Sequence, residues 1–362
     1  MLSSDDYKTY MNYFSRKYDF RICGEADIAE VVHFIDTYWK RNHALVASPK
    51  LLEWQHHNFK DSNYTFALAI HKKTGEIHAL EGYILSSQYD STIEFPIRWP
   101  AIWKIRDDVA PPGLGLMVHL FAINEIPTKI YGAMGISDLA FPLYSELDTV
   151  GYCIQWYILH PTKDNFQLVD NYFDSPRYNP LAYSNAGMKF VNCTETFMFL
   201  EGDVLSYIPD YKSKTYYINR YLKHPYYTYH ATKIHDEQNN VVSAVFFWRF
   251  CEFNGAKCIR VVDFFGNPAS LSGQCKNFQR LLIEEDAEFI DFINVGIGHE
   301  FFESAGFVNR ASTPIVLANY FEPFMLKNVD VSLRYAWSST NNLPPLFFKG
   351  DADQDRPNII ME

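Results

Sequence analysis

The sequence predicts an α/β protein built from two similar halves, each a mixed central sheet flanked by helices. Both halves show the same order of expected elements: three strands, a helix, a strand, a helix and a strand. The segments GAMGIS and INVGIG take equivalent places in the two halves, and so do LDTVGY and ESAGF. The 25 Tyr and 29 Phe residues add to the strand signal. An internal duplication explains these observations most simply.

The first half begins with a helix. Asp27 and Glu30 frame its start in a capping-box arrangement, and apolar residues at helical spacing continue to about Asn42. Two strand-like runs follow, and they predict two strands joined by the turn KKTGE. The ranges expected after the first helix are strands at 64–71, 77–86 and 99–106, a helix at 116–126, a strand at 129–135, a helix through Leu143 and Leu147, and a strand at 151–160.

The second half repeats this order. Its expected ranges are strands at 226–235, 241–251 and 258–266, a helix at 271–285, a strand at 288–296 and a short helix at 299–307. A polar segment rich in Asn and Tyr separates the halves, and the C-terminal segment begins too apolar for a free linker. We therefore expect a first domain at 1–165, a connector at 166–222, a degenerate second domain at 223–312, and a tail at 313–362 that packs across the domains.

Charge and composition exclude several classes of function. The chain has 32 Lys and Arg against 43 Asp and Glu, a formal net charge of −11, which argues against a nucleic-acid partner because that partner needs a basic surface. No run approaches the roughly 18 apolar residues of a membrane span, and the first residues show no secretory signal. The six cysteines form no CxxC pair, so reduced, buried thiols are expected. We expect a cytoplasmic protein with no membrane partner, and the oligomeric state stays open.

The segment after the third strand is a candidate anion site. In PPGLGLMVHLF, Gly113 and Gly115 open the expected helix on either side of Leu114. Backbone N–H groups at a helix start can point at a phosphate, and glycine lets the backbone approach that phosphate closely. A tight turn between a strand and a helix explains the same pattern equally well.

The order of a strand, a Gly-x-Gly helix, a strand, a short helix with Tyr and a final strand resembles the GNAT acyltransferases. The resemblance implies a coenzyme A thioester (acyl-CoA) as co-substrate, with its pyrophosphate at the glycine loop. It also implies that Tyr144, in AFPLYSEL, protonates the leaving thiolate. In that family the end of the preceding strand pairs with the pantetheine arm, which here implies Trp103, Lys104 and Ile105.

Three departures from the family pattern matter. Gly151 follows Tyr144 by seven residues, where the family usually has four, so the end of the helix is rebuilt. Ala110 stands where the family's loop usually begins with Arg or Gln, so one charge-assisted phosphate contact is missing. The second half has no Gly-x-Gly, offering only Gly273, and Phe302 stands at the Tyr position, where it cannot donate a proton. We therefore expect the first half to bind acyl-CoA and the second half to have lost that role.

A narrower resemblance points to an acceptor. The string YWKRNHALVASPKLLEWQHHN, the WKIRDD…PGLGL run and the closing FKGDADQDRPN are similar to tandem-GNAT proteins of bacterial surface-polysaccharide (lipopolysaccharide) loci. That group includes N-acyltransferases of nucleotide-linked amino sugars, which implies acyl transfer to the amine of a dTDP- or UDP-linked amino-deoxysugar. No Cys lies in the motif region as an acyl carrier, so we expect direct attack in a ternary complex.

Amide formation needs a group that takes a proton from the sugar ammonium. Asp90, after the second strand, is the first candidate, and Glu94 is the next. His43 follows the first helix, where this fold borders the acceptor site. Each has a structural alternative: Asp90 can cap a turn, Glu94 can be a solvated loop charge, and His43 can be a histidine held at a helix end.

Candidate ligands for the acceptor lie in the second half and the tail. Asp353 and Asp355 can hold an amine or sugar hydroxyls, while Arg356 can pair with phosphate or base oxygens. The alternative for this acidic tail is a salt-bridged clasp. Three further candidates face the place of the lost CoA site, namely Asp263, His299 and Glu300.

No metal site is expected. His56 and His57 are adjacent, so they do not face one another on a helix, and no carboxylate or Cys stands at ligand spacing. Two other functions stay open. One is a peptidyl or aminoacyl transferase that takes aminoacyl-tRNA, which the acidic charge disfavours. The other is a non-catalytic GNAT scaffold that binds acyl-CoA or a sugar nucleotide.

Overall fold

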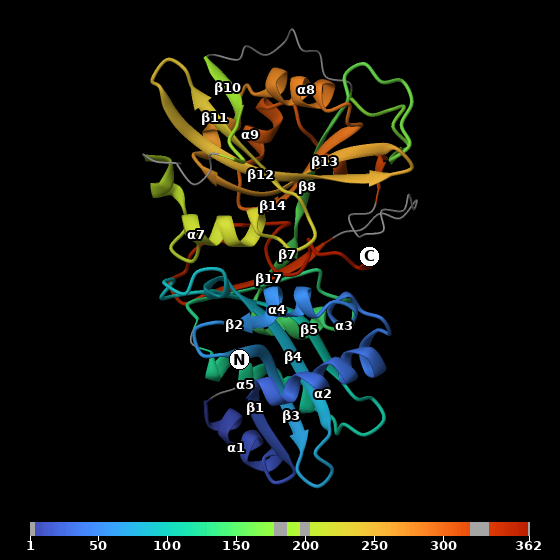
Figure 1. The fold of residues 1–362 in the computed structure, drawn as a ribbon, viewed down its shortest axis with the longest axis vertical. Coiled ribbons are helices and arrows are strands. Elements are labelled where there is room, and N and C mark those ends of the chain that lie inside the picture. The colour runs from blue at the N-terminus through green and yellow to red at the C-terminus, as the bar shows by residue number, and fades with distance from the viewer. Residues whose placement is uncertain (1–3, 127, 177–186, 196–202, 319–332, 361–362) are drawn as a thin grey trace. The chain divides into compact units, whose positions relative to one another are not determined.

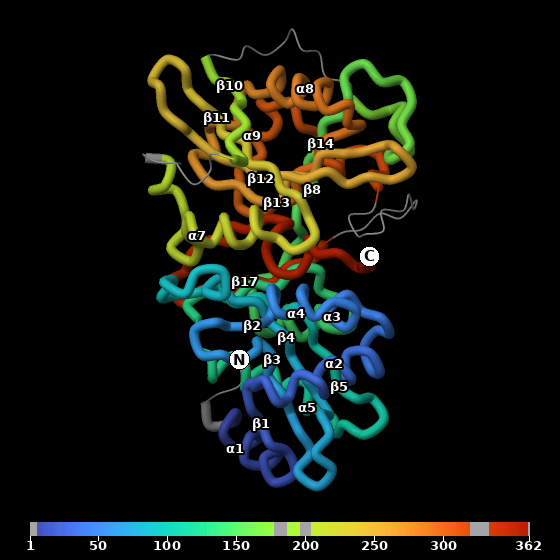
Figure 2. Tube along the Cα trace, in the orientation of Figure 1, coloured from blue at the N-terminus to red at the C-terminus, as the bar shows by residue number. Residues whose placement is uncertain are grey.

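The computed structural model describes residues 4–126, 128–176, 187–195, 203–318 and 333–360. The chain forms two units, which Figure 1 shows as a ribbon. The first unit holds residues 1–151, 335–343 and 358–362, and the second holds 152–334 and 344–357. The C-terminal segments of both units can be followed by their red colour in Figure 2.

An eight-stranded mixed sheet forms the first unit, in the order β1, β3, β4, β5, β6, β17, β7, with β2 beside β3. Neighbours from β1 to β5 are antiparallel, β5 and β6 are parallel, and β6 and β17 are antiparallel. The strands are β1 (Tyr18–Cys23), β2 (His57–Asn58), β3 (Asn63–His71), β4 (Ile77–Leu85), β5 (Ile97–Ile105), β6 (Ile130–Met134), β7 (Thr149–Tyr152) and β17 (Arg334–Ser339).

Helices cover both faces of this sheet, because side chains on its strands alternate between two apolar layers. Phe66 and Leu68 of β3 face α2, α3 and α4, whereas Ala67 and Ala69 face α1 and α5. The helices are α1 (Ser4–Phe14), α2 (Ile28–Phe34, continued by a π-helical turn at Ile35–Trp39), α3 (Ala44–Ala47), α4 (Pro49–His56), α5 (Leu114–Glu125) and α6 (Phe141–Leu147).

The second unit has a sheet of the same design, in the order β10, β11, β12, β13, β14, β8, β15, with β18 beside β14. Its β13 and β14 are parallel, as β5 and β6 are in the first unit. The strands are β8 (Ile154–Leu159), β10 (Met188–Asn192), β11 (His230–Asp236), β12 (Val241–Phe253), β13 (Ala256–Gly266), β14 (Phe289–Val295), β15 (Val308–Asn309) and β18 (Phe347–Phe348), while β9 (Val169–Asp170) and β16 (Val316–Leu317) pair separately.

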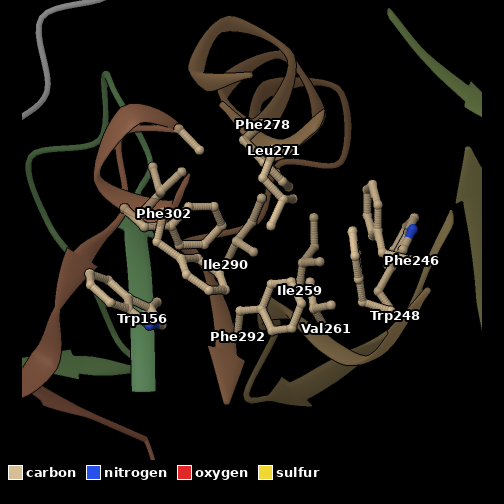
Figure 3. Packing of buried hydrophobic residues seen from close by; sticks show 14 of the residues in the cluster. Trp156, Phe246, Trp248, Ile259, Val261, Leu271, Phe278, Ile290, Phe292 and Phe302 are labelled. Carbon is tan, nitrogen blue, oxygen red and sulfur yellow. The ribbon is translucent and has the colours of Figure 1, made fainter. Parts of the chain in front are cut away.

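The main core of the second unit lies between this sheet and the helices α8 (Cys275–Glu284) and α9 (His299–Ser304). Figure 3 shows the aromatic and aliphatic side chains that fill it, among them Phe278 and Phe302 from the helices and Phe292 from β14. Tyr217, at the end of α7 (Lys214–Tyr217), stacks instead on Phe247, whose neighbour Phe246 points into the main core. The two faces of β12 are therefore both covered.

The predicted α/β fold with two similar halves is confirmed, because the two sheets have matching strand orders. The unit boundaries differ from the expected ranges. The strand expected at 151–160 is two strands, β7 and β8, which join different sheets, so the first unit's main segment ends at 151 and not at 165. The expected connector contains β10, an edge strand of the second sheet. The tail supplies β17 to the first sheet and β18 to the second.

Within the described ranges, no helix is both long and apolar enough to cross a bilayer. All six cysteines are free thiols, and five of them are buried.

Candidate active site

In the first unit, strands β5 and β6 diverge after a short paired stretch, and we call the space between them the wedge. These parallel strands pair only at Ile97 with Ile130 and at Arg98 with Tyr131. Beyond these pairs β5 runs on to Ile105, while β6 pairs on its other side with β17. The wedge therefore has a closed end at Arg98 and an open end at the last residues of β5.

Helix α5 begins at the open end of this wedge. Gly113 precedes it with φ of +87°, a left-handed conformation that favours glycine. A Cβ on Gly115 would lie 3.0 Å from Ile105 Cγ2, and Trp103 Nε1 donates to the Gly115 carbonyl at 3.0 Å. Both glycines thus let α5 start directly against β5, where the N–H groups of its first turn point out of the helix. Leu114 itself is fully buried.

Five polar or aromatic side chains meet at the closed end, and we name them the apex cluster: Glu81, Arg98, His119, Tyr131 and Tyr144. Glu81, on β4, is fully buried, and its Oε1 accepts from Arg98 Nη1 at 3.1 Å. Its Oε2 lies 2.5 Å from Nδ1 of His119, on α5. In the neutral ring, a carboxylate at that distance favours the tautomer with its proton on Nδ1, and Nε2 then carries the lone pair. His119 is therefore oriented as a base.

Tyr144, on α6, packs against the rest of the apex cluster. Its ring lies 6.0 Å from those of Trp103 and His119 and 6.3 Å from that of Tyr131, measured between centroids. Burial, followed by the charge of Glu81, raises the pKa of Tyr144 well above its ordinary value. Its hydroxyl thus keeps its proton at neutral pH, as a proton donor must.

A cavity of about 310 Å³ adjoins the closed end of the wedge. Arg98, His119 and Tyr131 of the apex cluster line it. Its other polar lining includes Asn124, Lys129, Asp148, Ser338 and Thr340. Burial raises the pKa of Asp148, against the opposing effect of His119 and Arg98.

The three residues expected to act as a base lie outside the apex cluster. Asp90 Oδ1 accepts from the Thr92 backbone N–H at 2.9 Å and from its hydroxyl at 2.7 Å, which is the turn cap that the sequence allows. Glu94 is exposed. His43 precedes α3, and its Nδ1 accepts from the Leu45 N–H at 3.3 Å. Each residue thus takes a local structural role or lies in solvent.

The sequence analysis did not single out Glu81, Arg98 or His119. A signal for two of them is present: Glu81 is the single charge in the apolar strand IHALEGYIL, and His119 interrupts the apolar helix segment LMVHLF. Isolated polar residues in buried elements need partners, but the sequence does not show that these two residues meet. Lys104, predicted to contact the pantetheine arm, pairs with Asp107 at 2.5 Å.

The corresponding wedge of the second unit is occupied by the chain's own tail. β13 and β14 pair only at 259–261 with 290–292. Beyond these pairs β18 joins β14, the Lys349 N–H donates to the Ile293 carbonyl at 3.2 Å, and the Gly350 N–H donates to the Val262 carbonyl at 2.7 Å. In the described part of the first unit, no segment bridges β5 and β6 in this way.

The candidate acceptor ligands of the tail are engaged within the second unit. Asp355 is buried, and it accepts from Arg249 and, at 2.6 Å, from the Tyr229 hydroxyl. Arg249 and these contacts hold the pKa of Asp355 below its ordinary value against the effect of burial. Asp353 accepts from Arg356 Nε at 3.2 Å. These contacts correspond to the salt-bridged clasp.

The three candidates before the tail are divided between the interior and the surface. Asp263 accepts from Lys212 Nζ at 2.8 Å and from the Tyr221 hydroxyl at 2.7 Å, and burial raises its pKa to about 6. His299 and Glu300 are exposed at the start of α9. Among the residues that the structure describes, no group of three or more His, Cys, Asp and Glu is arranged to hold a metal ion.

No protein-family model matches the sequence, and no curated protein matches it. Two solved structures share the fold. One is a GCN5-related N-acetyltransferase from Anabaena variabilis, with a TM-score of 0.50 and 9% identity over 89% of this chain and 72% of its own. The other is a protein from Enterococcus faecalis described as a probable N-acyltransferase, with a TM-score of 0.51 and 8% identity over 88% of this chain and 71% of its own. The chain therefore has the fold of the GCN5-related N-acetyltransferases, as the sequence predicts.

Proposed function

We propose that the protein is an acyl-CoA-dependent N-acyltransferase whose donor site is the wedge of the first unit. The observation that carries this proposal is the pairing of a glycine-started helix at the open end with an acid–base set at the closed end. The N–H groups at the start of α5 bind the pyrophosphate. The thioester arm then follows the last residues of β5 toward the apex cluster.

His119 and Tyr144 divide the proton transfers. Nε2 of His119 takes a proton from the acceptor's ammonium group, and the Glu81 carboxylate stabilises the imidazolium that forms. The nitrogen lone pair then attacks the thioester carbonyl, the carbon–sulfur bond breaks, and the nitrogen releases its second proton to solvent as the amide forms. His119 returns the first proton to solvent before the next turnover. Tyr144 gives its proton to the departing thiolate and recovers one from solvent. Asp90, Glu94 and His43 stay secondary candidates for the base.

The acceptor that we propose is the amine of a nucleotide-linked amino-deoxysugar. Its support is that three segments, within 38–58, 103–116 and 348–358, resemble a group of tandem-GNAT proteins that includes N-acyltransferases of nucleotide-linked amino sugars. Because the tail occupies the second unit's wedge, we propose that one chain binds one acyl-CoA.

The test is to incubate the full chain with acetyl-CoA or a short hydroxyacyl-CoA and a panel of dTDP- and UDP-linked amino sugars. Thiol release is followed with a chromogenic disulfide, and the product mass is measured. We expect release that depends on one amino sugar and gives the matching amide. Tyr144→Phe should slow release while acyl-CoA still binds.

Three other results bear on the alternatives. Binding of CoA with no turnover of any pair supports the non-catalytic scaffold. Turnover with other amines but with no amino sugar contradicts the proposed acceptor and keeps the acyltransferase. No binding of CoA contradicts the donor site at the start of α5.

A further inference from the structure

Beside the cavity, buried N–H groups of Arg98 lack hydrogen-bond acceptors among the residues that the structure describes. Arg98 is 1% exposed and uses Nη1 to bind Glu81. Its Nε and Nη2 are also buried, and neither has a hydrogen-bond partner among the residues that the structure describes. Buried donors of this kind are nearly always paired in folded proteins. The guanidinium lies 4.9 Å from the centroid of the Tyr131 ring, which covers its face and leaves its N–H edges to find acceptors.

The cavity lies at the end of the proposed donor site that is opposite to the pyrophosphate. It is lined by Arg98 and Tyr131, the last pair that β5 and β6 make before they diverge. It is also lined by Ile123 and Asn124, near the end of α5, whereas the proposed pyrophosphate site is at the start of that helix. Along the helix axis, Gly115 and Asn124 are separated by about 14 Å. A thioester arm entering at the open end therefore directs its acyl group into the cavity.

The cavity has more room than an acetyl group fills. A cavity of about 150 Å³ binds benzene, so the 310 Å³ here has room for a ligand of about twice that size. Its lining holds the acidic residue Asp148 and the basic residues Lys129 and Arg98, and Arg98 is paired with Glu81. The lining therefore suits a polar group at one point and does not demand a net charge.

Resting on the proposed function, we infer that this cavity selects an acyl group larger than acetyl that carries an additional oxygen, which accepts hydrogen bonds from Nε and Nη2 of Arg98. A hydroxyl, a keto group and a carboxylate share this chemistry. Arg98 is then a specificity-determining residue of the donor site.

Calorimetry with acyl-CoA and no acceptor tests this inference without relying on turnover. The probes are butyryl-CoA, 3-hydroxybutyryl-CoA, acetoacetyl-CoA and succinyl-CoA, which share chain length and differ in oxygens. We expect the native chain to bind one oxygen-bearing thioester about 10- to 100-fold tighter than butyryl-CoA, the range of a buried hydrogen bond to a charged group. The member that binds tightest identifies the kind of oxygen.

The matched variants are Arg98→Met/Glu81→Gln, which removes both charges together, and Lys40→Met, which removes an exposed cation. The ratio of affinities should fall toward one in the first variant and stay unchanged in the second. Equal affinities in the native chain, or a ratio that survives in the double variant, overturns the inference while the donor site stands. Failure of every thioester to bind overturns the proposed donor site, and this inference with it.

Discussion

Breaking the buried ion pair of the apex cluster should cost far more than removing it entirely. Glu81 and Arg98 are 0% and 1% exposed, and Glu81 is in hydrogen-bond contact with both Arg98 and His119. In Glu81→Gln, the Arg98 charge stays buried without its counter-charge. In Arg98→Met/Glu81→Gln, neither charge is left in the interior.

The magnitude follows from this burial. Removing one member of a buried pair typically costs 3–5 kcal/mol, whereas replacing both is often close to neutral. In a folding unit of about 150–250 residues, each kcal/mol shifts Tm by about 2–4 °C. The single variant should therefore melt about 6–20 °C below the native chain, and the double variant should recover much of that loss.

Thermal unfolding followed by tryptophan fluorescence checks this prediction, because Trp99 and Trp103 lie in the same sheet. Asp107→Asn is the matched control, since its ion pair with Lys104 is 74% exposed on the Asp107 side and should contribute little. A double variant that melts as low as Glu81→Gln or lower refutes the reasoning. So does a Glu81→Gln chain that melts like the control.

Three further predictions concern the tail. Gly350→Ala should destabilise the second unit by about 1–3 kcal/mol in urea unfolding, because the new Cβ would lie 2.4 Å from the Tyr221 hydroxyl and 2.7 Å from the Val262 carbonyl. Gly24→Ala is the control: its Cβ would meet only an atom at 3.8 Å, so it should not destabilise the protein in this way. Burial lowers the pKa of Lys349 from 10.5 to about 7. Between pH 7 and pH 10.5 the Lys349 amine is therefore protonated in the unfolded chain and mostly neutral in the folded chain. The free energy of unfolding should rise with pH across this range. Lys349→Met should lose that rise, and an identical pH dependence in both chains would contradict it. A chain ending at residue 312 lacks β17, so it should lose the cooperative melting of the first unit in circular dichroism; native-like melting would show that β17 is dispensable.

Local elements were predictable because their signals are local. The strands expected at 64–71 and 77–86 are β3 at Asn63–His71 and β4 at Ile77–Leu85. Each is a continuous apolar run, and the turn KKTGE separates them. The glycine-started helix was predictable for the same reason, since Gly113 marks a left-handed residue before α5.

Long-range pairing was not predictable from one sequence. Residues 151–160 form one apolar run, yet β7 and β8 belong to different sheets, and no residue in that run signals the change. The insertion of β17 between β6 and β7 is likewise decided by hydrogen bonds between segments about 200 residues apart. The apex cluster also depends on contacts between segments that are distant in the sequence, because Glu81 and His119 meet only after β4 and α5 have packed. A sequence pattern can mark such residues as unusual without showing what they contact.

The most direct test of the central claim is a crystal structure of the full chain grown with coenzyme A. The account predicts density for one molecule, with its pyrophosphate at the first turn of α5 and its arm in the wedge between β5 and β6. Residues 347–350 should remain between β13 and β14. Coenzyme A in the second wedge with the tail displaced, or a first wedge that stays empty at saturating ligand, would contradict the account.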